Sequence, residues 1–298
     1  MGFSARYHAA SLAAVFFALA IGILIGSQIG GDILDNTRKD LEASLTSDLD
    51  ASRAEVDDLE QELGWANEFG DSVYPPLTAL QLRGDRLGVI GFGSLPTGIT
   101  DAIEEAIDPT SADLVGVGVV RQPPDLAELA DSLGGTPFAA MGNRPALLTP
   151  YGKVVGRQLV TGGQILQQSR PALMSESSGR FGDLDGLIIY RGAEEDLSPE
   201  EVELSDRLGD AMIDGAGTTR ARLVGVEEVS TDPSSIDYYA NRGLSSVDDI
   251  NLPAGRVSLV YGLAGAQGSF GVKKASDRLL PDLLLPATGP TGITGEKG

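Results

Sequence analysis

An uninterrupted apolar stretch near the start of the chain constrains its fold more than any other feature. Ala9–Ile29 holds 21 residues without one formal charge. At 1.5 Å per residue, a helix of this length crosses a bilayer core of ~30 Å. The alternative is a cleaved secretory signal peptide, whose apolar region normally runs only about 7–15 residues. The longer run, and its continuation into Ile33 and Leu34, favour an uncleaved signal-anchor.

Small residues recur at every fourth position of this stretch. They are Ala10, Ala14, Ala18, Gly22, Gly26 and Gly30. The spacing lines them along one helix face, where a second helix backbone can approach closely. Glycine is also common in membrane helices generally, so ordinary composition is the alternative explanation. We predict a helix-pairing face.

An acidic segment with helical spacing follows directly. Its heptad seam, in which successive members lie alternately four and three residues apart, consists of Ser52 and five apolar residues: Leu45, Leu49, Val56, Leu59 and Leu63. Thirteen acidic residues against three basic ones lie between Asp32 and Asp71. Because dense like charge weakens a coiled coil, we expect a marginal helix pair. The alternative is a single amphipathic helix folded back on its own domain. In either case Tyr74–Pro75–Pro76 is predicted to end the helix, since proline cannot continue it.

Beyond the prolines, short apolar runs alternate with helical patterns. The predicted strands are Leu87–Gly93, Asp113–Val120, Gly186–Arg191, Arg220–Val229 and Arg256–Leu263. The predicted helices are Ile99–Ile107, Pro124–Leu133, Leu148–Met174 and one that opens at Ser198 with a capping box to Glu201. This order predicts a mostly parallel sheet with helices on both faces. The expected fold class is α/β: a single N-terminal transmembrane helix, a juxtamembrane coiled-coil helix and a mostly parallel α/β sandwich domain.

These features divide the chain into four parts. We expect a cytoplasmic tip and transmembrane helix over 1–31, an acidic coiled-coil helix over 32–72, an extracytoplasmic α/β domain over 73–285 and a disordered tail over 286–298. Basic residues are almost balanced across the apolar stretch, so they determine orientation weakly. Acidic Asp32 and Asp35 directly follow it. We expect a single-pass protein of the cell membrane with a cytoplasmic N-terminus and the bulk of the chain outside.

Composition excludes several classes of function. The net charge of −21 argues against a nucleic-acid partner, because phosphate binding needs clustered Lys and Arg. The chain has no cysteine, so disulfides, thiolate metal sites and cysteine nucleophiles are excluded. Its single histidine, His8, precedes the apolar stretch, which excludes a hydrolytic triad in the folded domain. Lys153, Lys273 and Lys274 stay open as bases, but no nucleophile-elbow sequence accompanies them. We predict that the protein is not an enzyme.

No cofactor site is evident either. Gly91-Phe92-Gly93 sits where a phosphate-binding turn would, but the third glycine of that fingerprint is missing and a tight turn explains it. Glu194-Glu195-Asp196 and Asp248-Asp249 could bind a hard cation, and solvated loops are the favoured interpretation. The scattered methionines Met141, Met174 and Met212 are predicted to be ordinary core or surface residues.

Two ends of the sequence resemble a known family. Near the N-terminus the matching residues are Arg6–Phe16, Leu19–Gly22 and Gly26-Ser27; near the C-terminus they are Ser246–Ile250, Gly255–Val257, Gly271-Val272 and Leu280-Pro281. They resemble the actinobacterial copper transporter family typified by mycobacterial copper transport protein B (MctB-like). The resemblance implies a single-pass protein of the cell envelope linked to copper export or homeostasis. Other relatives are associated with envelope assembly and division through a membrane partner.

The residues make direct copper handling by one chain awkward. Cu(I) prefers thiolate and thioether ligands and Cu(II) favours imidazole, yet beyond the apolar stretch the chain offers no Cys, no His and three Met. One apolar helix also cannot enclose a channel alone. Two hypotheses follow. In the first, copper is the transported ion and an oligomer handles it. In the second, the protein is a non-enzymatic envelope scaffold or a cell-division partner without copper handling. Both expect a homo-oligomer, or another membrane protein, bound through the transmembrane helix and the coil.

Overall fold

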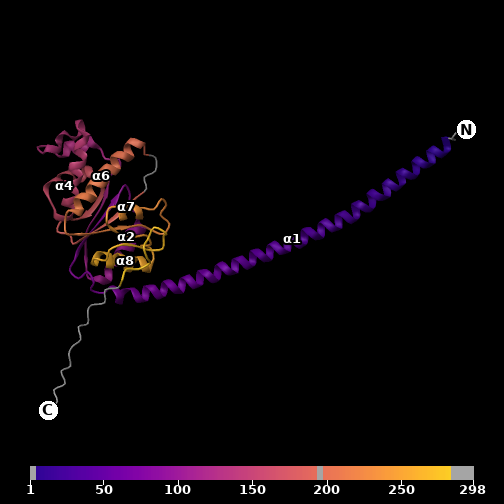
Figure 1. Cartoon of the computed structure of the whole chain (residues 1–298), viewed down its shortest axis with the longest axis horizontal. Helices are drawn as coiled ribbons and strands as arrows, with labels where there is room; N and C mark the ends of the chain where they lie inside the picture. Colours follow the sequence, from indigo (N-terminus) through magenta and orange to yellow (C-terminus); the bar gives the residue numbers. More distant parts are fainter. Residues whose placement is uncertain (1–4, 193–196, 283–298) are drawn as a thin grey trace, which may run out of the picture. The chain divides into compact units, whose positions relative to one another are not determined.

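The computed structural model describes residues 5–192 and 197–282, with side-chain surroundings given for all of these except 5–7 and 27–40. Contacts divide the chain into two units, residues 1–66 and 67–298. One long helix, α1 (Ala5–Thr78), supplies the described part of the first unit and enters the second, which holds every other described element (Figure 1). The predicted divisions after residues 31, 72 and 285 stay predictions. The predicted disordered tail from Pro286 lies outside the described residues.

Helix α1 does not end at Tyr74–Pro75–Pro76, so that prediction is wrong: both prolines lie inside the helix, which continues to Thr78. Proline lacks an N–H and its ring crowds the carbonyl four residues earlier, but its own carbonyl still accepts, as Pro75 does from the amide of Ala79 at 2.8 Å. Packing also stabilises this last turn. Tyr74 is buried against Val257 and Tyr261, and its hydroxyl donates to the carbonyl of Ala106.

A seven-stranded sheet forms the centre of the second unit, counted over the described residues, in the order β3-β2-β1-β4-β5-β6-β7. The strands are β1 (Arg86–Phe92), β2 (Asp113–Val120), β3 (Met174–Gly179), β4 (Gly186–Arg191), β5 (Arg222–Val226), β6 (Ser245–Val247) and β7 (Ser269–Phe270). All neighbours pair in parallel except β3, which runs antiparallel to β2. The α/β class with a mostly parallel sheet is therefore confirmed.

Helices cover both faces of the sheet, as the βα alternation predicts. The α-helices of this unit after α1 are α2 (Thr97–Ile107), α3 (Leu126–Ser132), α4 (Leu148–Thr161), α5 (Gln164–Leu173), α6 (Pro199–Gly217), α7 (Ile236–Ala240) and α8 (Pro253–Ala264). Three 3-10 helices, η1 (Asp108–Thr110), η2 (Pro137–Asn143) and η3 (Pro145–Leu147), complete the described helical elements. One core packs α2 and α8 on the sheet, and another packs α3 to α7 on the opposite face (Figure 1).

The predicted strand Arg256–Leu263 is wrong, because these residues lie in helix α8. The helix is buried on most of its surface. Val257 and Tyr261 contact the end of α1, while Leu259 and Val260 pack in the core beneath the sheet. A helix buried on several sides shows no amphipathic period, so a short apolar run of this kind cannot be told from a buried strand.

The other predicted elements are confirmed: β2 and β4 have the predicted limits, and the rest differ in theirs. Strand β5 is five residues long, shorter than the predicted Arg220–Val229. The predicted helix Leu148–Met174 is two helices separated at Gly162 and Gly163, and Met174 already begins strand β3. The capping box that opens α6 is present: the amide of Ser198 donates to Glu201 Oε2 at 2.8 Å, and Ser198 Oγ accepts from the amide of Glu201.

Candidate functional site

The first candidate is the apolar part of α1. His8–Gly26 is long and apolar enough to cross a membrane, and none of it is buried. Gly22 and Gly26 have open space around them, since a Cβ on either would meet no atom within 4 Å. The pairing face from Ala10 to Gly26 is therefore exposed in the single chain. The surroundings of Gly30 lie outside the described residues. Pairing through this face stays a prediction.

The acidic half of α1 exposes the predicted seam in the same way. Its five apolar residues are each 49–60% exposed: Leu45, Leu49, Val56, Leu59 and Leu63. They belong to the unit of residues 1–66. A helix with leucine and valine at heptad positions is normally stabilised when a second helix covers these side chains. The seam is accordingly an unpartnered apolar face, and the coiled coil itself stays a prediction.

The residues that could bind copper do not gather into one site. Met141, Met174 and Met212 are buried core residues, each at most 4% exposed. Across residues 8–26, 41–192 and 197–282, no group of three His, Asp or Glu residues could hold a metal ion. Described side chains of one chain therefore supply no soft-metal centre.

The pair Asp248-Asp249 was expected to be a solvated loop, and that prediction is wrong: both residues are completely buried. They follow directly from β6, at the carboxyl edge of the parallel strands. Asp248 accepts from the amide of Val272 at 2.8 Å, from the amide of Lys273 at 3.0 Å and from Ser276 Oγ. Asp248 therefore holds the segment after β7 against the sheet.

Asp249 has the opposite environment. Neither of its carboxylate oxygens has a hydrogen-bond partner among the described residues. Burial, with a smaller contribution from the charge of Asp248, raises the pKa of Asp249 to about 7. The backbone around the pair is tight, since a Cβ on Gly255 would lie 2.0 Å from the carbonyl oxygen of Asp249, and one on Gly271 would lie 2.1 Å from Asp248 Oδ1. Three C-terminal residues that carry the family resemblance, Gly255, Gly271 and Val272, therefore meet at this buried pair. The other acidic run, Glu194–Asp196, lies outside the described residues.

A buried ion pair adjoins this centre and was missed by sequence reasoning. Lys273 Nζ donates to Glu227 Oε1 at 2.7 Å and to the carbonyl of Thr231 at 2.7 Å. Glu227 also accepts from Ser234 Oγ at 2.6 Å and from the amide of Ser235 at 2.7 Å. Lys273 is thus the ion-pair partner of Glu227. The available signal was the position of Glu227 directly after a strand, where parallel sheets commonly place polar groups.

The glycine turn after β1 is closed around a serine. Gly93 has φ +78°, and a Cβ on Gly91 would lie 2.6 Å from the carbonyl oxygen of Ser94. A Cβ on Gly192, after the neighbouring strand β4, would lie 2.1 Å from Ser94 Oγ. This is the point where the strand order reverses, the usual ligand crevice of such sheets. Here Ser94 packs into it, which agrees with a tight turn.

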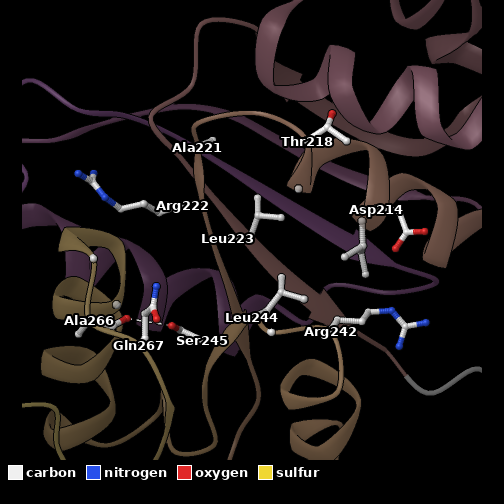
Figure 2. A pocket seen from close by; sticks show the side chains of 15 residues that line it. Asp214, Thr218, Ala221, Arg222, Leu223, Arg242, Leu244, Ser245, Ala266 and Gln267 are labelled. Atoms are coloured by element: carbon white, nitrogen blue, oxygen red, sulfur yellow. Dashed lines mark hydrogen bonds between the residues drawn. The ribbon is translucent and has the colours of Figure 1, made fainter.

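A further pocket, of about 510 Å³, opens at the amino edge of strands β5 and β6. Figure 2 shows Leu223 and Leu244 pointing into it, with Thr218, Ser245 and Gln267 around them. Three of its walls are the ends of α6, α7 and α8 and the residues that follow them. No local motif marks this pocket in the sequence, because its lining comes from separate turns.

An α/β unit that follows a helix long and apolar enough to cross a membrane defines a class of proteins compatible with membrane anchoring. Within that class, residues 3–174 match the family model described as "Copper transport outer membrane protein, MctB". The chain belongs to this family. The match ends at the start of β3, so the C-terminal residues of the resemblance lie beyond it. No curated protein matches the chain.

Proposed function

We propose that this protein serves copper export or homeostasis at the cell envelope as a non-enzymatic, single-pass membrane component. In this proposal the N-terminus is cytoplasmic and the α/β unit lies outside. Membership of the copper transport family carries the proposal. The apolar helix His8–Gly26 supports anchorage by its length and composition.

Copper passage would then depend on an assembly. Copper prefers thiolate, thioether or imidazole ligands. The three methionines beyond the apolar helix are buried in the core, so one chain offers no such ligand set there. A single helix also encloses no pore. Two faces of α1 are available to build an assembly: the small-residue face around Gly22 and Gly26, and the seam from Leu45 to Leu63. We propose a parallel homodimer, in which each face can meet its own copy, in preference to contact with another membrane protein.

Crosslinking tests the assembly directly. Because the chain has no cysteine, Ser52→Cys within the seam introduces a unique thiol. In a parallel pair this thiol faces its copy, and mild oxidation in membranes should give a disulfide dimer. Replacing both Gly22 and Gly26 by Leu should abolish the dimer, because bulk on the small-residue face separates the helices. Ala13→Leu with Ala20→Leu adds the same kind of bulk on the opposite side and should leave it intact. Equal crosslinking in both variants would refute pairing through the glycines.

Copper tolerance tests the role. A strain lacking the protein should lose copper tolerance and accumulate copper, and the wild-type chain should restore both. The Gly22→Leu, Gly26→Leu variant should fail to restore them if the assembly matters, while the Ala13→Leu, Ala20→Leu control succeeds. Normal copper tolerance in the deletion strain would end the copper proposal.

A second candidate function is an envelope scaffold or cell-division partner without copper handling. The specific observation that favours it is the long exposed seam, which could bind another protein, together with the scarcity of copper ligands. This candidate predicts a co-purifying membrane partner and a shape or septation defect at normal copper tolerance. The same deletion strain therefore separates the two functions.

A further inference from the structure

The pocket at the amino edge of β5 and β6 has a volume and an apolar base that suit a small organic ligand. Its volume of about 510 Å³ lies within the range of about 300–1,000 Å³ typical of small-molecule sites. Leu223 and Leu244 form an apolar floor and are only partly buried by the core beneath them. The walls are open because small residues line them, including Gly217, Gly243 and Gly265.

The C-terminal ends of two long helices border the pocket. Helix α6, of 19 residues, ends at Gly217, and helix α8, of 12 residues, ends at Ala264 before Gly265. A helix C-terminus carries about half a negative charge. At the end of α6 the carbonyls of Gly215 and Ala216 already accept from Thr218 and Thr219, so the contribution of this end is that of the helix dipole. Asp214, in the last turn of α6, adds a carboxylate that is 52% exposed. Its ion partner is Lys153, at a loose 3.7 Å.

The two arginines of the lining are each paired with a carboxylate. Arg242 donates to Asp210 at 2.6 Å and stacks on the ring of Tyr238 at 3.8 Å. Arg222 pairs with Asp85 at 3.4 Å. Figure 2 shows both side chains running outward, away from Leu223 and Leu244. Both guanidinium groups therefore lie away from a ligand seated on the leucines.

We propose that this pocket binds a small organic cation, namely an alkylammonium group whose apolar chain rests on Leu223 and Leu244. Its ammonium group would lie toward Asp214 and the carbonyl end of α6. The leucine floor distinguishes this ligand from an inorganic cation, and the helix ends distinguish it from an anion. The site is independent of the proposed copper role.

Saturation-transfer NMR of n-butylammonium tests the site, with the full-length protein in phosphatidylcholine nanodiscs at pH 7 and empty nanodiscs as the blank. Binding should be saturable, with a dissociation constant in the millimolar range expected for so small a ligand. Butyrate should not bind saturably. n-Butanol and ammonium should each bind at least about threefold more weakly than n-butylammonium, since each keeps only one of its two features.

Two variants locate the binding. Asp214→Asn should weaken n-butylammonium about threefold or more, and Ala221→Leu should block it by filling the pocket. Glu203→Gln is the matched control, because it removes an exposed carboxylate of the same helix outside the pocket. Circular dichroism checks that each variant is folded. Equal binding of butanol and butylammonium, saturable binding of butyrate, or an unchanged constant in Asp214→Asn would each overturn the proposal.

Discussion

Asp248 and Asp249 are adjacent in sequence and equally buried, yet their chemical environments are opposite. Asp248 accepts three hydrogen bonds from residues 272–276. Asp249 has no such partner in the described chain, and burial favours its protonated form. At the residue scale, Asp248 therefore holds residues 272–276 in place, whereas ionisation of Asp249 is unfavourable in the folded chain.

The first prediction concerns the pH dependence of stability. The pKa of Asp249 is raised from 3.8 to about 7 in the folded chain. A raised folded-state pKa contributes stability below the unfolded pKa, and this contribution is lost as the pH rises toward 7. A tenfold difference in proton affinity between the folded and unfolded chain corresponds to ~1.4 kcal/mol. Between pH 4 and 8 we expect the wild type to lose about 2–4 kcal/mol through this group.

Asp249→Asn tests this prediction in urea unfolding series across pH. The variant keeps the size of the side chain and removes the titration, so its stability relative to wild type should increase as the pH rises from 4 to 8. Asp101→Asn is a matched control at an exposed carboxylate of helix α2 and should show no such increase. A constant difference between Asp249→Asn and wild type across this range would contradict the raised pKa.

Close packing of α4 against α6 depends on glycine at the element scale. A Cβ on Gly156 would lie 1.8 Å from the carbonyl oxygen of Met212, and one on Gly215 would lie 2.1 Å from the carbonyl oxygen of Lys153. Each helix thus presents a glycine to the backbone of the other. This contact positions the end of α6, and with it one wall of the 510 Å³ pocket.

We therefore predict that Gly156→Ala destabilises the α/β unit by about 2–3 kcal/mol, because the two helices must move apart. Gly217→Ala is the control: it lies at the end of α6, and its added Cβ would meet no atom closer than 3.8 Å. It should change stability by less than about 0.5 kcal/mol. The free energy of unfolding in urea measures both. Similar values for the two variants would contradict the packing argument.

Some elements could be read from sequence and others could not, for physical reasons. Strand β4 and the capped start of α6 depend on local apolar runs and local hydrogen bonds, so their predicted limits hold. Strand β3 is polar and exposed along most of its length, and only its pairing with β2 makes it a strand. Helix α8 was misassigned because neighbours cover it on several sides.

At the scale of the whole molecule, the exposed seam and the α/β core belong to different units. The seam residues Leu49 and Leu59 lie in the unit of residues 1–66, whereas six of the seven tyrosines lie in the other unit. We predict that Leu49→Ser with Leu59→Ser abolishes the disulfide dimer of Ser52→Cys. The same variant should leave the stability of the α/β unit unchanged within about 0.5 kcal/mol.

Near-ultraviolet circular dichroism of the tyrosines during thermal unfolding measures the second part of this prediction. Unchanged melting together with lost crosslinking would agree with a seam used only for association. A lowered melting temperature of the α/β unit would instead mean that the seam packs on its own domain, the alternative that its sequence pattern also allows.

The sequence by itself determined the apolar helix, the α/β alternation and the family resemblance, because each depends on residue types at short spacing. Apolar length is a local property, and so are a capping box and a buried strand. Only the tertiary structure decided that Asp248 and Asp249 are buried and that Glu227 pairs with Lys273. It alone also brought three helix ends to one pocket. These features depend on residues brought together from distant parts of the chain, and no local pattern encodes such neighbours.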